Sequence, residues 1–239
     1  MSREAARGVA RDAAIAAAAT AALYLVVFAA AGPFGFVNFD DPEVVHANPV
    51  RSWAGIGAAF TERMAHAWLP LYALSLGIDN LLFGPANPGP WHAHSALLHA
   101  LNAALVVGIA RRLGAGRAAS LTAGLLFGLH PAVTESVAWV ASRKDLVSFA
   151  FAAGSVLVFL RAEEEPRRPA LHGLGALLLG LGMLAKGTVV VVPALLALAV
   201  LARAADAPAR RGGLLATLPY AAMAIGLAAV HYAIAAAEG

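Results

Sequence analysis

The chain has 239 residues, of which 60% are hydrophobic and 13% are charged, and its mean hydropathy is +0.73. These values exclude an ordinary soluble domain and predict a polytopic membrane protein. The chain contains no cysteine, which excludes a disulfide framework and a thiolate metal site. Its net charge of +3 comes from short basic clusters between apolar segments, so we expect no nucleic-acid partner.

Apolar segments recur along the whole chain and predict an all-α fold with about seven transmembrane helices. The first segment, 13–31, follows Arg3, Arg7 and Arg11 and holds no charged residue. It is long and no clear cleavage site follows it, so we interpret it as a retained span and not as a signal peptide. The other predicted spans are 91–110, 118–129, 145–160, 170–185, 187–202 and 212–237.

A long loop, residues 33–90, separates the first two predicted spans. Its apolar pieces are too short or too interrupted to cross a bilayer, which favours helices that lie at the membrane interface. Aromatic side chains concentrate at such interfaces. We therefore predict interfacial anchoring by Trp53, Trp68, Tyr72 and Trp91.

Basic residues are distributed unevenly between the two ends of the predicted spans. One side carries 12 of the 17 Lys and Arg residues: Arg3, Arg7, Arg11, Arg111, Arg112, Arg117, Arg161, Arg167, Arg168, Arg203, Arg210 and Arg211. Because cytoplasmic loops are enriched in Lys and Arg, this asymmetry predicts a cytoplasmic N-terminus and a long first loop outside. The richness in Ala, Gly and Arg is typical of a bacterial protein, which indicates the bacterial inner membrane.

Acidic residues cluster in the first outer loop, where Asp40, Asp41 and Glu43 lie within four positions. Carboxylates beside a membrane are costly unless they are solvated, paired or functional. A carboxylate can act as general base toward a hydroxyl. The simpler interpretation is a solvated loop with an Asp-Pro turn.

Three cations are predicted on the same outer side as this acidic cluster: Arg143, Lys144 and Lys186. Such cations can stabilise charge on a departing phosphate. The alternative is that Arg143 and Lys144 pair with Glu135 or Asp145 at the interface.

Histidines in the second span offer a different interpretation. His92 and His99 are seven residues apart and share a helix face, and Asn102 follows three residues later. These residues, with His94, could form a metal or haem site, but polar residues in a span more often bind neighbouring helices. No second cluster completes a coordination sphere, so we assign no metal ligand, although a divalent metal is compatible with the chemistry.

Several motifs resemble the membrane O-mannosyltransferases that carry tetratricopeptide repeats. The resemblance covers about residues 36–193, and the run from 130 to 146 is its most specific part. The motifs are Asn38-Phe39-Asp40-Asp41-Pro42, Trp68-Leu69-Pro70-Leu71, Asp79-Asn80-Leu81-Leu82-Phe83-Gly84, Trp91-His92, Leu97-Leu98-His99-Ala100-Leu101-Asn102, His130-Pro131, Glu135-Ser136-Val137-Ala138-Trp139 and Arg143-Lys144-Asp145-Leu146.

This resemblance implies a C-type glycosyltransferase (GT-C) fold and an inverting transfer from a polyprenyl-phosphate sugar to a hydroxyl of a protein or glycan. It implies that Asp40 and Asp41 are the acidic pair of the active site. It makes Arg143, Lys144 and Lys186 candidates for the donor phosphate. The pocket residues would be His92, His99, Asn102, His130, Glu135 and Trp139.

The two aspartates are expected to differ in role. Asp40 is expected to be the base, whereas Asp41 precedes Pro42, which favours an extended backbone and a positioning role. Repulsion between neighbouring carboxylates should raise the pKa of one of them. A base with a raised pKa is better matched to taking a hydroxyl proton, so the rise is expected on Asp40.

Residues 1–239 are interpreted as a single transmembrane module, because no helical repeat of about 34 residues follows the predicted spans. Two other functions stay open: a non-enzymatic transporter or scaffold, and an inactive fragment of the enzyme. A transporter is expected to place ionisable residues at the midplane and to show paired repeats, neither of which is visible here.

Overall fold

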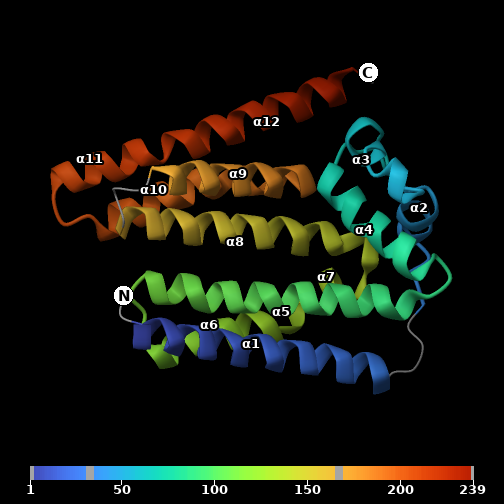
Figure 1. Ribbon diagram of the computed structural model, residues 1–239, viewed down its shortest axis with the longest axis horizontal. Helices are drawn as coiled ribbons and strands as arrows, with labels where there is room; N and C mark the ends of the chain where they lie inside the picture. The colour runs from blue at the N-terminus through green and yellow to red at the C-terminus, as the bar shows by residue number, and fades with distance from the viewer. Residues whose placement is uncertain (1–2, 31–34, 165–168, 238–239) are drawn as a thin grey trace.

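The computed structural model describes residues 3–30, 35–164 and 169–237 (Figure 1). These residues form helices and, in the described ranges, no β-strand, so the predicted all-α fold is confirmed. The α-helices are α1 (Arg3–Ala30), α2 (Asp41–His46), α3 (Ala58–Thr61), α4 (Pro70–Phe83), α5 (Pro88–Arg112), α6 (Arg117–Leu129), α7 (Thr134–Ala138), α8 (Arg143–Glu164), α9 (Ala170–Ala185), α10 (Val192–Arg203), α11 (Ala207–Ala216) and α12 (Leu218–Ala236). Short 3-10 helices are η1 (Trp53–Gly55), η2 (Pro131–Val133), η3 (Val140–Ser142) and η4 (Gly187–Val191).

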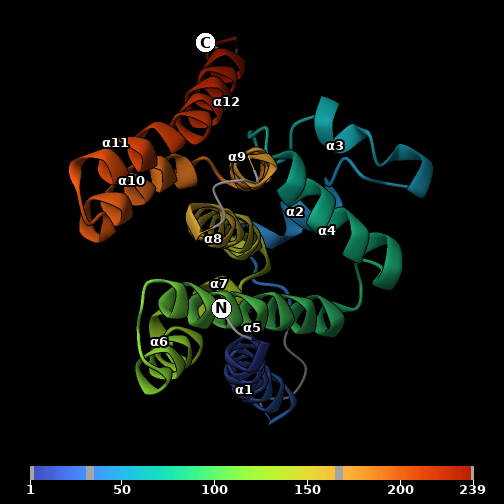
Figure 2. The ribbon, with the colours of Figure 1, turned by 60° about the vertical axis from the view of Figure 1, so that its left-hand side comes forward.

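The long helices run along the long axis of the molecule, and α2, α3 and α4 gather at one end of them (Figure 1). Helix α5 packs against α1, α6 and α8, and α8 packs in turn against α9. Figure 2 shows α8 between α5 and α9, with α12 beyond α9. We call the end that carries α2–α4 the capped end.

Four helical stretches of the described chain are long and apolar enough to cross a membrane: Ala6–Ala30, Pro88–Arg112, Val140–Glu164 and Ala207–Ala236. The predicted third, fifth and sixth spans correspond to shorter helices, Arg117–Leu129, Ala170–Ala185 and Gly187–Arg203. A multi-pass membrane protein is therefore supported by length and composition, whereas the count of about seven spans stays a prediction.

The first loop has a hydrophobic core of its own at the capped end. The described part, from residue 35 onward, buries Val44, Val50 and Leu76 together with Trp91 and Val140. The start of the predicted loop, residues 33–34, lies outside the described residues. The loop therefore forms a packed cap on the bundle, and its position at a membrane interface stays a prediction.

Two of the predicted interfacial anchors are wrong in this fold. Trp91 is 0% exposed and Tyr72 is 3% exposed, because both side chains lie inside the core of the cap. Trp53, which is 57% exposed, can still meet an interface. Sequence position next to an apolar segment could not distinguish an anchor from a core residue.

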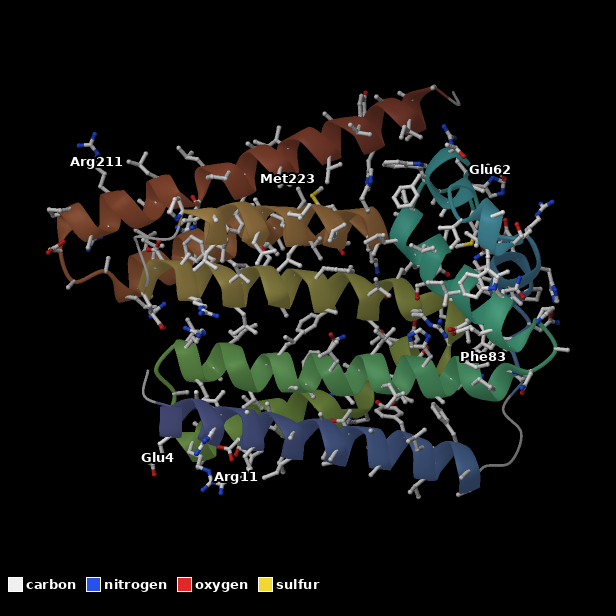
Figure 3. The ribbon with its side chains drawn as sticks, viewed as in Figure 1. Glu4, Arg11, Glu62, Phe83, Arg211 and Met223 are labelled. Carbon is white, nitrogen blue, oxygen red and sulfur yellow. The ribbon has the colours of Figure 1, made fainter. Side chains whose placement is uncertain are left out.

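Ion pairs join the helices at the end opposite the cap. The guanidinium of Arg117 donates from Nε to both carboxylate oxygens of Asp12 at 3.0 Å, which links α6 to α1. Arg112 donates to Glu164 at 2.7 Å, which links α5 to α8. Arg11 and Arg211 also lie toward this end, whereas Glu62 and Phe83 lie at the capped end (Figure 3). The described basic clusters therefore gather at one end of the bundle, as the predicted topology requires.

Small residues allow α9 and α12 to approach closely. A Cβ at Gly175 would lie 2.1 Å from the hydroxyl oxygen of Tyr220, and one at Gly180 would lie 2.9 Å from the sulfur of Met223. Met223 is seen between α12 and α9 in Figure 3. Tyr220 is fully buried in a core cluster that includes Phe159 and Leu179. This contact depends on the absence of a side chain at Gly175.

We predict that Gly175→Val destabilises the protein by about 1–3 kcal/mol, because the added side chain must displace the packed Tyr220 ring. Gly173→Val is the matched control, since it places the same side chain in the same helix where nothing lies within 4 Å. The measurement is thermal unfolding of each purified variant in detergent. An equal loss of thermal stability in the two variants would show that the contact between Gly175 and Tyr220 is not the cause of the destabilisation.

Candidate active site

Asp41 joins two segments that are far apart in the sequence. Its Oδ2 accepts a hydrogen bond from the backbone N–H of Val37 at 2.8 Å. Its Oδ1 accepts another from the backbone N–H of Ala141 at 2.7 Å, across 100 residues of chain. The side chain is fully buried. These bonds fix the acidic loop against η3, the turn that leads directly into α8.

Burial raises the pKa of Asp41, while the backbone N–H groups of Val37 and Ala141 lower it. The raised pKa was expected on the base, Asp40, through repulsion between neighbours. It lies instead on Asp41, and its cause is burial. Asp40 is partly exposed at the start of α2 and makes no capping hydrogen bond with its side chain. Asp40 is thus the member of the pair that a substrate can reach.

Arg143 is held inside the protein. Its side chain is 0% exposed, and it forms an ion pair with Asp79 through Nη1. Its Nη2 donates to the carbonyl oxygen of Trp91 at 2.7 Å, and its Nε donates to Ser95 Oγ at 3.1 Å. The other oxygen of Asp79 lies 2.6 Å from Nδ1 of His94. This cluster connects α4, α5 and α8.

The two lysines lie in less buried positions near this cluster. Lys144 follows Arg143 and places its Nζ 5.7 Å from the centre of the Tyr72 ring, a cation–π contact. Lys186, in the turn between α9 and η4, forms an ion pair with Asp145. The side chains of Lys186 and Asp145 are 28% and 38% exposed, so solvent and ligands can reach this pair.

Tyr72 shows that these charged groups share one region. Its hydroxyl donates to the carbonyl oxygen of Ala141 at 2.8 Å, so it supports the turn that Asp41 also binds. Burial is the main cause that raises the pKa of Tyr72, and the charges of Asp41, Asp40 and Asp145 raise it further. The cap, the start of α8 and the α9–η4 turn therefore meet at one site.

The predicted pocket residues separate into three groups. His92 and Trp139 lie beside the acidic loop: His92 Nε2 is 3.3 Å from the carbonyl oxygen of Gly35, and the Trp139 ring is 6.0 Å from that of Phe39. His99 and Asn102 are fully buried deeper in α5 and line a cavity. His130 and Glu135 are exposed, and His130 Nδ1 accepts a hydrogen bond from the N–H of Ala132 at 3.1 Å.

Sequence reasoning missed Asp79 as the partner of Arg143. The predicted partners were Glu135 and Asp145, but Glu135 is exposed and Asp145 binds Lys186. The sequence did contain a signal, because Asp79 lies in an apolar helix, where a carboxylate needs a cation. No feature of the sequence indicated which of the outer cations would face it. Among the described residues, no group of three or more His, Cys, Asp or Glu side chains could hold a metal ion.

The fold and this site define a multi-pass membrane protein whose buried and accessible charges converge at one end of a helical bundle. The chain belongs to the dolichyl-phosphate-mannose-protein mannosyltransferase family, whose model matches residues 65–234. Asp40 and Asp41 precede the matched residues.

Three relatives of the chain are named protein O-mannosyl-transferases. The chain is 36% identical over 140 residues to Protein O-mannosyl-transferase Tmtc2 of Drosophila melanogaster, which covers 56% of this chain and 15% of that protein. It is 36% identical over 125 residues to Protein O-mannosyl-transferase Tmtc1 of Drosophila melanogaster, a match that covers 48% of this chain and 14% of that protein. It is 32% identical over 130 residues to Protein O-mannosyl-transferase TMTC4 of Homo sapiens, a match that covers 48% of this chain and 18% of that protein. No solved structure matches the chain. The matched region is therefore less than a fifth of these relatives.

We predict that Asp41→Ala destabilises the cap, because it leaves the N–H of Ala141 buried without an acceptor, at a cost of about 1–3 kcal/mol. Asp40→Ala is the matched control, since the Asp40 side chain makes no capping bond. Thermal unfolding in detergent and limited proteolysis of residues 35–50 measure the effect. If Asp40→Ala lowers stability as much as Asp41→Ala, the division of roles between the two aspartates is wrong.

Proposed function

We propose that this chain is a membrane glycosyltransferase module that moves a mannose-like sugar from a polyprenyl-phosphate donor to a hydroxyl of a protein. Family membership supports the reaction class. The observation that carries the proposal is the pair of hydrogen bonds that the Asp41 carboxylate accepts from the backbone N–H groups of Val37 and Ala141. These bonds bring an accessible carboxylate, Asp40, to the region that holds Lys144 and Lys186.

In this proposal Asp40 is the general base. The acceptor hydroxyl oxygen attacks the anomeric carbon of the sugar, and Asp40 takes the hydroxyl proton. The bond between the anomeric carbon and the phosphate oxygen breaks, and the phosphate leaves with the electron pair. Attack opposite to the leaving phosphate inverts the configuration. The proposal assigns no cofactor to this step; a divalent metal is compatible with the chemistry, although the residues do not indicate one.

Lys144 and Lys186 are assigned to the departing phosphate. Their side chains are partly exposed, and an ammonium near the leaving oxygen stabilises its developing charge. Lys186 is paired with Asp145 in this structure, so a phosphate that binds there would take the place of a carboxylate. Arg143, a third predicted phosphate ligand, instead satisfies Asp79 inside the protein. We therefore assign Arg143 a positioning role.

The proposed setting is the inner membrane of a bacterium, with the N-terminus in the cytoplasm and the capped end outside. The uneven distribution of Lys and Arg supports this orientation. The described members of the basic clusters lie at the end of the bundle opposite the cap. A polyprenyl-phosphate sugar, an acceptor protein and the membrane lipid itself are the partners that this setting implies.

We predict that Asp40→Asn lowers turnover by about 10²–10⁴-fold, because the amide cannot take the hydroxyl proton. Donor affinity should stay within about twofold, since Asp40 is assigned no phosphate contact. The measurements are release of polyprenyl phosphate from mannosyl-phosphoryl-polyprenol with an acceptor peptide rich in Ser and Thr, and donor binding to purified protein. Near-normal turnover of folded Asp40→Asn would remove the proposed base.

Neutralising the lysines should affect the donor and not the fold. We expect Lys144→Gln and Lys186→Gln to lower kcat/KM by about 10- to 1,000-fold through lost charge stabilisation, with little change in thermal stability. Arg143→Gln is the contrasting variant, because it removes the buried cation that pairs with Asp79 and leaves only the contact with His94. Breaking such a buried pair costs about 3–5 kcal/mol of stability. If both lysine variants keep normal kinetics, they do not bind the phosphate.

A further inference from the structure

A cavity of about 290 Å³ lies beside the proposed phosphate site, between α5, α7, α8 and η4. Its polar lining includes His99 and Asn102 of α5, Ser136 of α7, and Asp145 and Ser148 of α8. His99 and Asn102 are both 0% exposed. Each has one polar atom, Nδ1 of His99 and Oδ1 of Asn102, without a hydrogen-bond partner in the described part of the chain. Buried polar atoms are rarely left without partners.

The hydrogen bonds that His99 does make define what its free nitrogen needs. Its Nε2 lies 3.2 Å from the carbonyl oxygen of Gly128, and a carbonyl oxygen only accepts, so Nε2 carries a hydrogen. A buried charge is costly without a counter-ion, and no carboxylate pairs with His99 in the described residues. The imidazole is therefore neutral, and Nδ1 is an acceptor. Tyr24 and Phe127 contact the ring and keep its orientation.

Asn102 is oriented in the same way. Its Nδ2 donates to the carbonyl oxygen of Leu146 at 3.0 Å, so the amide oxygen Oδ1 is the atom left without a partner. Ser148 uses its hydroxyl hydrogen on the carbonyl oxygen of Asp145 at 3.1 Å, so its oxygen can only accept a further bond. The cavity therefore presents mainly acceptors, and the hydroxyls of Ser136 and Thr188 in its lining can donate or accept. Its described lining contains no Lys or Arg.

This set of acceptors selects the ligand chemistry. An anionic phosphate would face acceptors and the Asp145 carboxylate, which repel it. A group that donates hydrogen bonds, such as a sugar hydroxyl, would satisfy Nδ1 of His99 and Oδ1 of Asn102. The stacked rings of Phe127 and Phe149, whose centres are 4.8 Å apart, give the cavity an apolar wall suited to the C–H face of a sugar ring.

Asp145 ties this cavity to the proposed phosphate site, because it lines the cavity and also binds Lys186. Resting on the proposed function, we infer that the cavity binds the sugar ring of the polyprenyl-phosphate donor, with His99 Nδ1 and Asn102 Oδ1 accepting hydrogen bonds from its hydroxyls. The sugar then lies next to the lysine that holds its phosphate. His99 and Asn102 determine sugar specificity in this arrangement.

The test compares two probes, mannosyl-phosphoryl-polyprenol and bare polyprenyl phosphate, in binding assays with purified protein in nanodiscs. Asn102→Leu and His99→Phe should each weaken binding of the mannosyl lipid about tenfold, the effect of roughly one lost hydrogen bond, and leave binding of the bare phosphate unchanged. Ser155→Ala is the control, because Ser155 donates to the Gly175 carbonyl at 2.8 Å and does not line the cavity. It should change neither affinity.

A second series keeps the test independent of variant folding. Wild-type protein is titrated with mannosyl lipids that lack one hydroxyl each, and at least one should bind about tenfold more weakly than the parent. Equal weakening of both lipids in the variants, or equal affinity of all deoxy donors, would overturn the inference. Sugar-dependent binding without turnover would contradict the proposed function alone. Turnover with equal binding of all deoxy donors would contradict the sugar site alone.

Discussion

The two hydrogen bonds accepted by the buried carboxylate of Asp41 hold the site together. The ring contact between Phe39 and Trp139 also joins the acidic loop to the segment that leads into α8. Backbone N–H donors are fixed in direction, so a carboxylate between Val37 and Ala141 sets the position of both segments. This interaction places Asp40 at the surface of the cap, because adjacent residues direct their side chains differently. One aspartate therefore organises the site and the other is left accessible.

Buried charge imposes the second constraint. Arg143 and Asp79 are both buried. If the pair separated, each charge would stay out of water without its partner, which is energetically costly. The pair connects α4 of the cap to α8 of the bundle, and the bonds from Arg143 to Trp91 and Ser95 add α5. The neighbouring Lys144 and Lys186 are partly exposed. The same stretch of sequence thus supplies a buried charge, Arg143, and an accessible charge, Lys144, which the proposal assigns to the donor phosphate.

Part of this arrangement could be predicted from the sequence. Long apolar runs predicted the helices at 13–31, 91–110, 145–160 and 212–237, because length and composition are local properties. The acidic cluster at Asp40 and Asp41 stood out because carboxylates are few in this chain. The different roles expected of the two aspartates rested on the Pro42 that follows Asp41. The contact that buries Asp41, with Ala141 100 residues away, is contained in no local pattern. Similarly, Trp91 reads as an interfacial anchor by sequence and is a core residue, since the cap folds over it.

The most direct test of this account is a structure of the protein in a lipid nanodisc with a non-hydrolysable mannosyl-phosphonate polyprenol. We predict that the phosphonate lies about 3 Å from the ammonium of Lys144 or Lys186, with Asp40 facing the anomeric carbon and the Arg143–Asp79 pair intact. A phosphonate bound by Arg143 after that pair has opened would contradict the account. So would a ligand bound at the opposite end of the bundle, near Arg111 and Arg112.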